Sequence, residues 1–102
     1  MAEIEALAHI LEGEGGACGI LGFLAIAHVF SRNDTMYGWQ TPSPLAEFVA
    51  MWWYMMPDPT LGAEFLFSKQ DLQDPRVHAI IKGRGPPKLV VDCQASLALY
   101  AY

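Results

Sequence analysis

Apolar residues recur at helical spacing in the first third of the chain. Residues 3–12 carry them at i, i+3, i+4 and i+7, starting from Ile4, and this pattern predicts a short amphipathic helix. Glycines at positions 13, 15 and 16 follow, and we expect the chain to bend there because glycine has low helix propensity. Residues 20–31 are almost entirely apolar, which predicts a buried helix that ends at the polar residues 32–34.

A third helix is predicted after a loop over residues 34–43. Ser43 is a good N-cap residue and Pro44 suits the first helical position. The apolar pattern continues to Met56, and the prolines of Pro57-Asp58-Pro59 then stop the helix.

The second half of the chain predicts short elements of mixed type. Residues 61–67 are aromatic and partly alternating, which favours a strand, and residues 71–81 suit a short helix that begins near Asp74. Residues 89–91 and the closing LALYAY are further extended candidates. With 102 residues and 11.3 kDa, we expect a single domain over residues 1–102, with a mostly helical α+β fold and a short β element.

Composition excludes several classes of protein. Apolar residues make up 53% of the chain and charged residues 17%, which argues against disorder. The net charge of -5 and the lack of a basic stripe argue against nucleic-acid binding. The longest uncharged apolar stretch, residues 17–29, is too short for an integral membrane segment. The N-terminus lacks the pattern of a signal peptide, so we expect no export signal.

Cysteines and histidines give no sign of a metal site. Cys18 and Cys93 are in no metal-ligand spacing, and we expect two buried free thiols, with a single bridge between them as the alternative. His9, His28 and His78 are far apart in sequence, and we expect His28 to be a hydrogen-bonded core residue. No nucleotide-binding or nucleophile motif is present, so neither a metal nor a cofactor is expected.

Glu14 is the strongest candidate for chemistry. It follows an apolar helix and is flanked by glycines, which let a ligand approach the backbone. Partial burial at such a bend would raise the pKa of the carboxyl, as a general acid requires. The alternative is that Glu12 and Glu14 are ordinary surface acids at a helix end.

The chain resembles a known family in three segments. LAHILEGEGGACGILGFLAIAHVFSRN resembles the opening of the spore cortex-lytic (SleB-type) cell wall hydrolases, whose pattern is Leu-Ala-Arg, then Gly-Glu-Ala, a glycine and a helix ending in Asn-Arg. DPTLGA is similar to the family's Asp-Pro-Thr-Gly-Gly-Ala, and the closing LYAY to its terminal aromatic strand. The matching positions are Leu7-Ala8, Gly13-Glu14, Gly22, Arg32-Asn33, Asp58–Ala63 and Leu99–Tyr102.

The resemblance implies a lysozyme-like domain that cuts the glycan strand of peptidoglycan. Glu14 would be the acid that protonates the glycosidic oxygen. In a lytic transglycosylase the same carboxylate would then take the proton of the muramoyl C6 hydroxyl, giving a 1,6-anhydro product. A hydrolytic muramidase would use a second acid, for which Asp34, Asp58 and Glu64 are the candidates.

The resemblance also implies a sugar groove. The family's groove segment falls near Trp39, Gln40 and Thr41, where Trp39 could stack on a sugar. Thr60 and Glu64 would flank the same groove. Alternatively, Trp39 caps the core and Thr60 supports its own turn.

Some positions depart from the family pattern. His9 replaces an arginine, Leu61 replaces the first glycine of the Gly-Gly pair, and residues 63–66 lack the family's polar groove residue. A divergent relative without full activity therefore remains an alternative.

Three functional hypotheses follow. The first is a peptidoglycan-cleaving enzyme that acts on the cell wall, such as a phage or prophage endolysin. The second is a non-catalytic helical interaction module that docks a partner through Trp52, Trp53, Met55 and Met56, although we expect these residues to be core. The third and weakest is a membrane-lytic protein of the holin type.

Overall fold

The computed structural model describes residues 2–16, 18–33, 36, 38–93 and 98–102. Helices dominate and the strands form one small sheet, so the fold is mostly helical α+β, as predicted. The elements are α1 (Ala2–Gly15), α2 (Gly19–Arg32), α3 (Pro44–Trp52), the 3-10 helix η1 (Trp53–Met55), β1 (Leu66–Phe67), the 3-10 helix η2 (Asp71–Gln73), α4 (Pro75–Arg84), β2 (Lys88–Asp92) and β3 (Ala98–Ala101).

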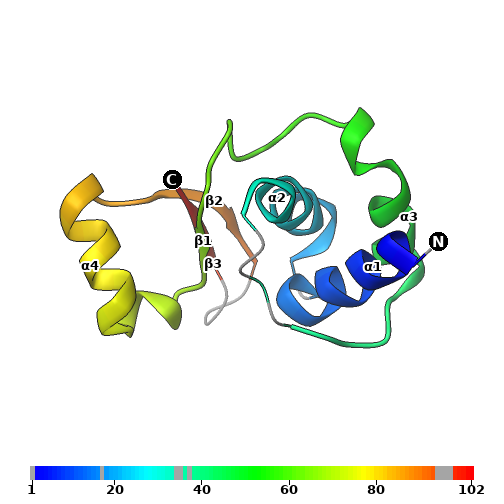
Figure 1. The fold of residues 1–102 in the computed structure, drawn as a ribbon, viewed down its shortest axis with the longest axis horizontal. Coiled ribbons are helices and arrows are strands. Elements are labelled where there is room, and N and C mark those ends of the chain that lie inside the picture. The colour runs from blue at the N-terminus through cyan, green and yellow to red at the C-terminus, as the bar shows by residue number, and fades with distance from the viewer. Residues whose placement is uncertain (1, 17, 34–35, 37, 94–97) are drawn as a thin grey trace.

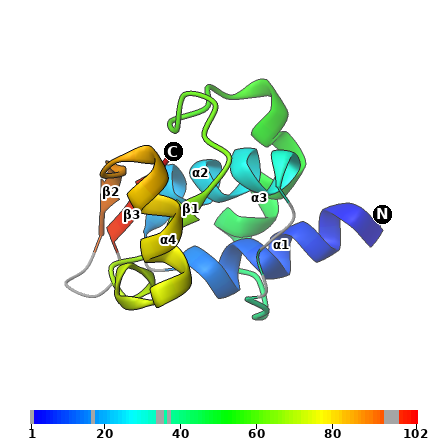
Figure 2. The ribbon, with the colours of Figure 1, turned by 60° about the vertical axis from the view of Figure 1, so that its left-hand side comes forward.

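Helix α2 is the centre of the structure. It packs against α1 and α3 on one side and against the sheet on the other (Figures 1 and 2). Phe23 and Ile26 are buried in the cluster shared with α1 and α3, while Ala25 and Val29 are buried with residues of the sheet. A helix buried on two sides must be apolar around most of its circumference, which is why this segment carries so few polar residues.

The sheet is antiparallel, with β3 between β1 and β2. Leu66 of β1 and Lys88 of β2 both pair with Ala101 of β3, so the C-terminal strand is hydrogen-bonded on both of its edges. Helix α4 has no buried residue and lies beyond the sheet, at the left in Figure 1. The sheet therefore separates α4 from the three-helix core.

The predicted helix starts are confirmed by their caps. The Ser43 hydroxyl accepts a hydrogen bond from the backbone N–H of Ala46, with Pro44 at the start of α3. Asp74 caps α4 through the N–H of Arg76, ahead of Pro75.

Three predicted boundaries are wrong. Helix α1 does not stop before its glycines but continues to Gly15, because the tertiary contacts described below outweigh glycine's low propensity. The third helix changes to 3-10 geometry after Trp52 instead of staying α-helical to Met56. Only residues 66–67 of the predicted strand over 61–67 are extended in the sheet, because residues 58–62 form a turn around the Asp58 side chain.

The expectation of two free thiols is also wrong. Cys18 and Cys93 form a disulfide, with their Cα atoms 4.8 Å apart, that joins the start of α2 to the end of β2. Gly22 makes room for it, because a Cβ atom at this position would lie 2.3 Å from the Cβ of Cys18. The two halves of the chain are thus cross-linked on the sheet side of α2.

Of the four residues around the end of the third helix that we expected in the core, two pack against it and two are exposed. Trp52 is 40% exposed and Met55 is 69% exposed, whereas Trp53 and Met56 are half-buried against the core. His28 is half-buried and makes the expected hydrogen bond, to the carbonyl oxygen of Met56 at 3.0 Å. In the described part of the chain, no helix combines the length and the apolar character needed to cross a membrane.

Candidate functional site

The end of α1 is crossed at very short range by the loop before α3. A Cβ atom at Gly13 would lie 2.3 Å from the backbone nitrogen of Trp39, and one at Gly38 would lie 2.7 Å from the carbonyl carbon of Gly13. Only glycine at both positions allows the two backbones to approach this closely. Gly13 therefore allows the close approach of the loop backbone, and the helix continues past it.

Glu14 lies at this crossing. Its side chain is half-buried, and the backbone N–H of Gly38 donates a hydrogen bond of 2.6 Å to its Oε1 atom. The predicted acid is therefore not an ordinary surface residue: the loop that crosses the helix fixes one of its oxygens in place.

Trp39 extends the site along α1. Its indole is 62% exposed and stacks on the His9 imidazole, with ring centroids 4.5 Å apart and an interplanar angle of 16°. The His9 ring is held in turn by a hydrogen bond of 2.8 Å from Nδ1 to the carbonyl oxygen of Glu5. Trp39 does not cap the core, and its exposed ring is available to a ligand.

Gln40 and Thr41 follow on the same loop and line a cavity of about 430 Å³ together with Glu12. The backbone N–H of Gln40 donates to the carbonyl oxygen of His9 at 3.1 Å, and that of Ser43 donates to Oε1 of Glu12 at 2.7 Å. The predicted groove segment is thus tied to α1 at Gly38, Gln40 and Ser43.

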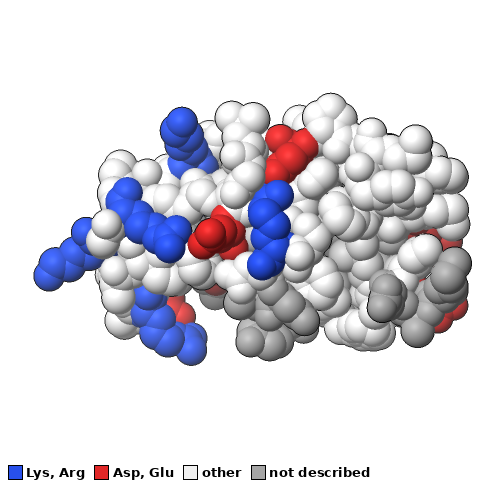
Figure 3. Space-filling view, turned by 45° about the horizontal axis from the view of Figure 1, so that its top comes forward, with Lys and Arg blue, Asp and Glu red and all other residues white. Residues whose placement is uncertain are grey.

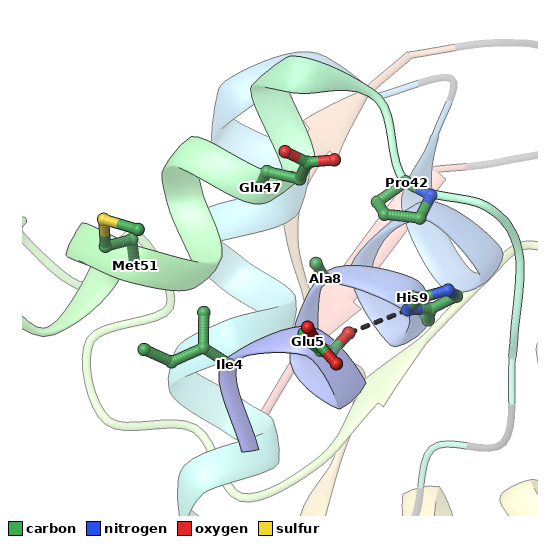
Figure 4. A pocket seen from close by; sticks show the side chains of 7 residues that line it. All are labelled: Ile4, Glu5, Ala8, His9, Pro42, Glu47 and Met51. Atoms are coloured by element: carbon green, nitrogen blue, oxygen red, sulfur yellow. Dashed lines mark hydrogen bonds between the residues drawn. The ribbon is translucent and has the colours of Figure 1, made fainter. Parts of the chain in front are cut away.

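A larger cavity of about 630 Å³ lies between α1 and α3 (Figure 4). Glu5 and His9 reach it from α1 and Glu47 from α3, and Pro42 borders both this cavity and the smaller one. Its walls are formed by Ile4, Glu5, Ala8, His9, Pro42, Glu47 and Met51. The two cavities and the exposed Trp39 ring thus follow one side of α1.

Thr60 and the two predicted second acids Asp58 and Glu64 belong to a different cluster. Arg32 forms an ion pair of 2.8 Å with Asp58, and its Nε donates to the carbonyl oxygen of Ala63 at 2.8 Å. The Thr60 hydroxyl donates to Asp58 at 2.7 Å and accepts from Arg32 at 3.0 Å. As the alternative interpretation held, Thr60 supports its own turn, although it also borders a cavity of about 450 Å³ beside the sheet.

Asp58 is an ionised structural acid. Burial alone would raise the pKa of this carboxyl. Hydrogen bonds from the side chain and backbone of Thr60, from the Gly62 N–H and from Arg32 together outweigh that effect, and the pKa falls to about 2. In a hydrolytic glycosidase the second carboxylate acts in its ionised form, as a base or nucleophile. Both oxygens of Asp58 already accept hydrogen bonds, and its low pKa makes it a weak base, so Asp58 is a poor second catalytic carboxylate.

Glu64 is exposed and lies 3.8 Å from Arg84 in an ion pair, while its carbonyl oxygen accepts a hydrogen bond from the Asn33 side chain at 3.0 Å. Its described interactions join it to the end of α2 and to α4. Asp34, the third candidate for a second acid, lies outside the described residues.

Sequence reasoning missed Glu12 and His9 as part of this site. Both belong to a polar stripe on α1 that begins at Glu5 and recurs at i+4 and i+7, beside the apolar stripe that faces the core. That spacing is a signal that all three side chains share one face of the helix, and it could have been noted beside the apolar pattern.

The described residues bring together no group of three or more histidine, cysteine, aspartate or glutamate side chains that could hold a metal ion. Comparison of the chain with protein-family models, with curated proteins and with solved structures finds no match. The function must therefore be proposed from the residues and their geometry.

Proposed function

We propose that the protein cleaves the glycan strand of peptidoglycan, with Glu14 as its general acid. The observation that carries the proposal is the contact between the two predicted parts of the site. Glu14 was predicted from its local sequence and from the family resemblance, and the Trp39–Thr41 segment from the resemblance alone. The backbone beside Glu14 and the backbone at Gly38, next to that segment, lie directly against each other. An acid held by the residue that precedes an exposed tryptophan suits a saccharide substrate, because aromatic rings stack on sugars. Glu14 itself lines none of the cavities described above.

The positions shared with the spore cortex-lytic family have physical roles that support the resemblance. Arg32 bonds to Asp58 and to the carbonyl oxygen of Ala63, which are far from it in sequence. Asn33 bonds to the carbonyl oxygen of the next residue, Glu64. Leu61 has a left-handed backbone with φ of 55°, at the position where the family has glycine. This chain therefore forms the turn with a leucine at a backbone conformation that favours glycine.

In this mechanism Glu14 first acts as the proton donor, with its Oε1 held by the Gly38 N–H. Transfer of the Glu14 proton to the glycosidic oxygen accompanies cleavage of the bond from that oxygen to C1 of the muramoyl sugar. In the transglycosylase route, the Glu14 carboxylate then takes the proton of the C6 hydroxyl as O6 bonds to C1. This restores the acid and yields the 1,6-anhydro product without water.

We favour the transglycosylase route because it needs only the Glu14 carboxylate. Hydrolysis would use a second carboxylate to activate water. Of the two candidates that the structure describes, Asp58 has both oxygens occupied within its own turn and Glu64 forms an ion pair with Arg84. The disulfide agrees with action at the cell wall, as by a phage or prophage endolysin, because disulfides persist outside the reducing cytoplasm.

Loss of turbidity of purified cell walls tests the proposal. Wild type should clear them and Glu14→Gln should not, while Asp92→Asn, a charge-matched change at an exposed residue of β2, should clear them like wild type. Equal clearing by Glu14→Gln and wild type would show that Glu14 is not the acid. Circular dichroism melting of each variant checks that the fold is retained.

The interaction module remains a second candidate, because one observation favours it. Trp52 and Met55, which we expected in the core, are exposed. If wild type does not clear cell walls of any type tested, this candidate gains at the expense of the enzyme.

A further inference from the structure

The outer face of α3 and η1 is unusually apolar. Six large apolar residues there are 40–69% exposed, and five of them, all except Tyr54, repeat at spacings of three or four along one side of the helix. We call this surface the α3 face, and its residues are Leu45, Phe48, Met51, Trp52, Tyr54 and Met55.

The α3 face has the size of a protein interface. Side chains of this type offer about 200 Å² each, so six that are on average about half exposed present roughly 600 Å². The largest apolar patch of a typical monomer is about 300–600 Å², and a stable interface covers about 600–1,000 Å² on each partner. The face is thus at the upper limit for a monomer and large enough for a small dimer interface.

Its shape is complementary to itself. Phe48, Trp52, Met55 and Met56 surround a hollow of about 390 Å³, and Met55 at its rim is 69% exposed, so its side chain projects there. A twofold axis brings the same patch of two copies together, so it needs both a projection and a hollow on one face. The α3 face has both.

The distribution of charge argues against an anionic lipid surface as the occupant. The only charged residue in residues 43–56 is Glu47, and the six Lys and Arg residues are at position 32 and within 69–88. In Figure 3 the basic side chains lie at the left and in the middle, away from the right-hand part where α3 lies in Figure 1. An anionic lipid surface would find no basic residue on the α3 face, whereas a second copy offers an apolar face of the same area.

We propose that two copies of this chain dimerise through the α3 face, around a twofold axis that places Met55 of each copy in the hollow of the other. The dimer buries the exposed aromatic and methionine side chains, and its centre contains no charged group. The proposal does not depend on peptidoglycan cleavage.

Sedimentation equilibrium over a range of concentrations tests it. Wild type should be a reversible dimer, and Met55→Glu should weaken the association at least tenfold because it places a carboxylate in the apolar interface. Leu89→Glu, which makes the same type of change at a 52% exposed residue of β2, should dimerise like wild type. Added sodium chloride should strengthen the wild-type dimer, because it screens the repulsion between two negative chains.

Three results would overturn the proposal. They are a monomeric wild type at every concentration, a dimer that Met55→Glu does not weaken, and a dimer that salt dissociates. Binding of monomeric wild type to phosphatidylcholine vesicles, lost in Met55→Glu, would instead assign the face to a lipid surface. Met55 is 69% exposed, so the substitution should not unfold the chain, and Phe48→Lys, at a 49% exposed residue of the same hollow, is a second variant with the same expected loss.

Discussion

Replacing Asp58 by asparagine should destabilise the protein near neutral pH and have almost no effect in acid. The Asp58 carboxylate joins Arg32 to the turn over residues 58–62. It forms an ion pair of 2.8 Å with Arg32 and accepts hydrogen bonds from Thr60 and Gly62. Asparagine keeps the shape of the side chain but loses its charge, so the variant isolates the charged part of these interactions.

The magnitude follows from the pKa of Asp58. Its fall from 3.8 to about 2 corresponds to about 2 kcal/mol of stability, and the side chain is only 18% exposed, so solvent screening removes little of this. Because the pKa is lower in the folded state than in the unfolded state, this stability is fully present above about pH 4. It is lost as pH falls through about 2.

Urea unfolding from about pH 6 to about pH 2 measures this effect. The difference between wild type and Asp58→Asn should fall from about 2 kcal/mol to near zero over that range. Asp92→Asn is the control, because its carboxylate is 61% exposed and its ion pair with Lys69 is 3.6 Å long. A wild-type-to-Asp58→Asn difference that stays constant with pH, or is absent at pH 6, would refute the reasoning.

Two substitutions and the reduction of the disulfide test the fold. Gly13→Ala should cost about 2 kcal/mol or more in urea unfolding, because its Cβ would meet the crossing backbone, whereas Gly83→Ala in α4 has open space and should stabilise by up to about 1 kcal/mol; equal effects would argue against the crossing. Leu61→Gly should raise the melting temperature slightly, since Leu61 is 88% exposed and pays about 1 kcal/mol for its left-handed backbone; a clear loss of stability would contradict that strain. Reducing the disulfide between Cys18 and Cys93, which are 75 residues apart, should cost up to about 4 kcal/mol in thermal melting, with two thiols appearing on titration; thiols titrating before reduction would show that the bridge is not formed.

Local signals in the sequence were sufficient for the elements that depend on local chemistry. The apolar composition of residues 20–31 predicted the buried central helix, and Ser43-Pro44 predicted the start of α3. Glu14 and the Trp39–Thr41 segment were predicted as candidate site residues with the help of the family resemblance. The sequence alone does not show the contact between Glu14 and Gly38, because these residues are 24 positions apart.

What the sequence could not predict depends on distant contacts. The glycines of α1 look like a helix end until the loop at Gly38 is known to lie on them. Cys18 and Cys93 are separated by 75 residues, and neither position indicates the other. Trp52 and Met55 follow a core pattern, but an apolar stripe does not tell whether another part of the chain covers it.

Mass spectrometry of the muropeptides released from purified peptidoglycan tests the central claim most directly. Wild type and Asp92→Asn should release disaccharide fragments that end in 1,6-anhydromuramic acid, and Glu14→Gln should release none. Fragments from Glu14→Gln at the wild-type rate, or no glycan fragments from wild type, would contradict the assignment of Glu14 as the acid that cuts the strand.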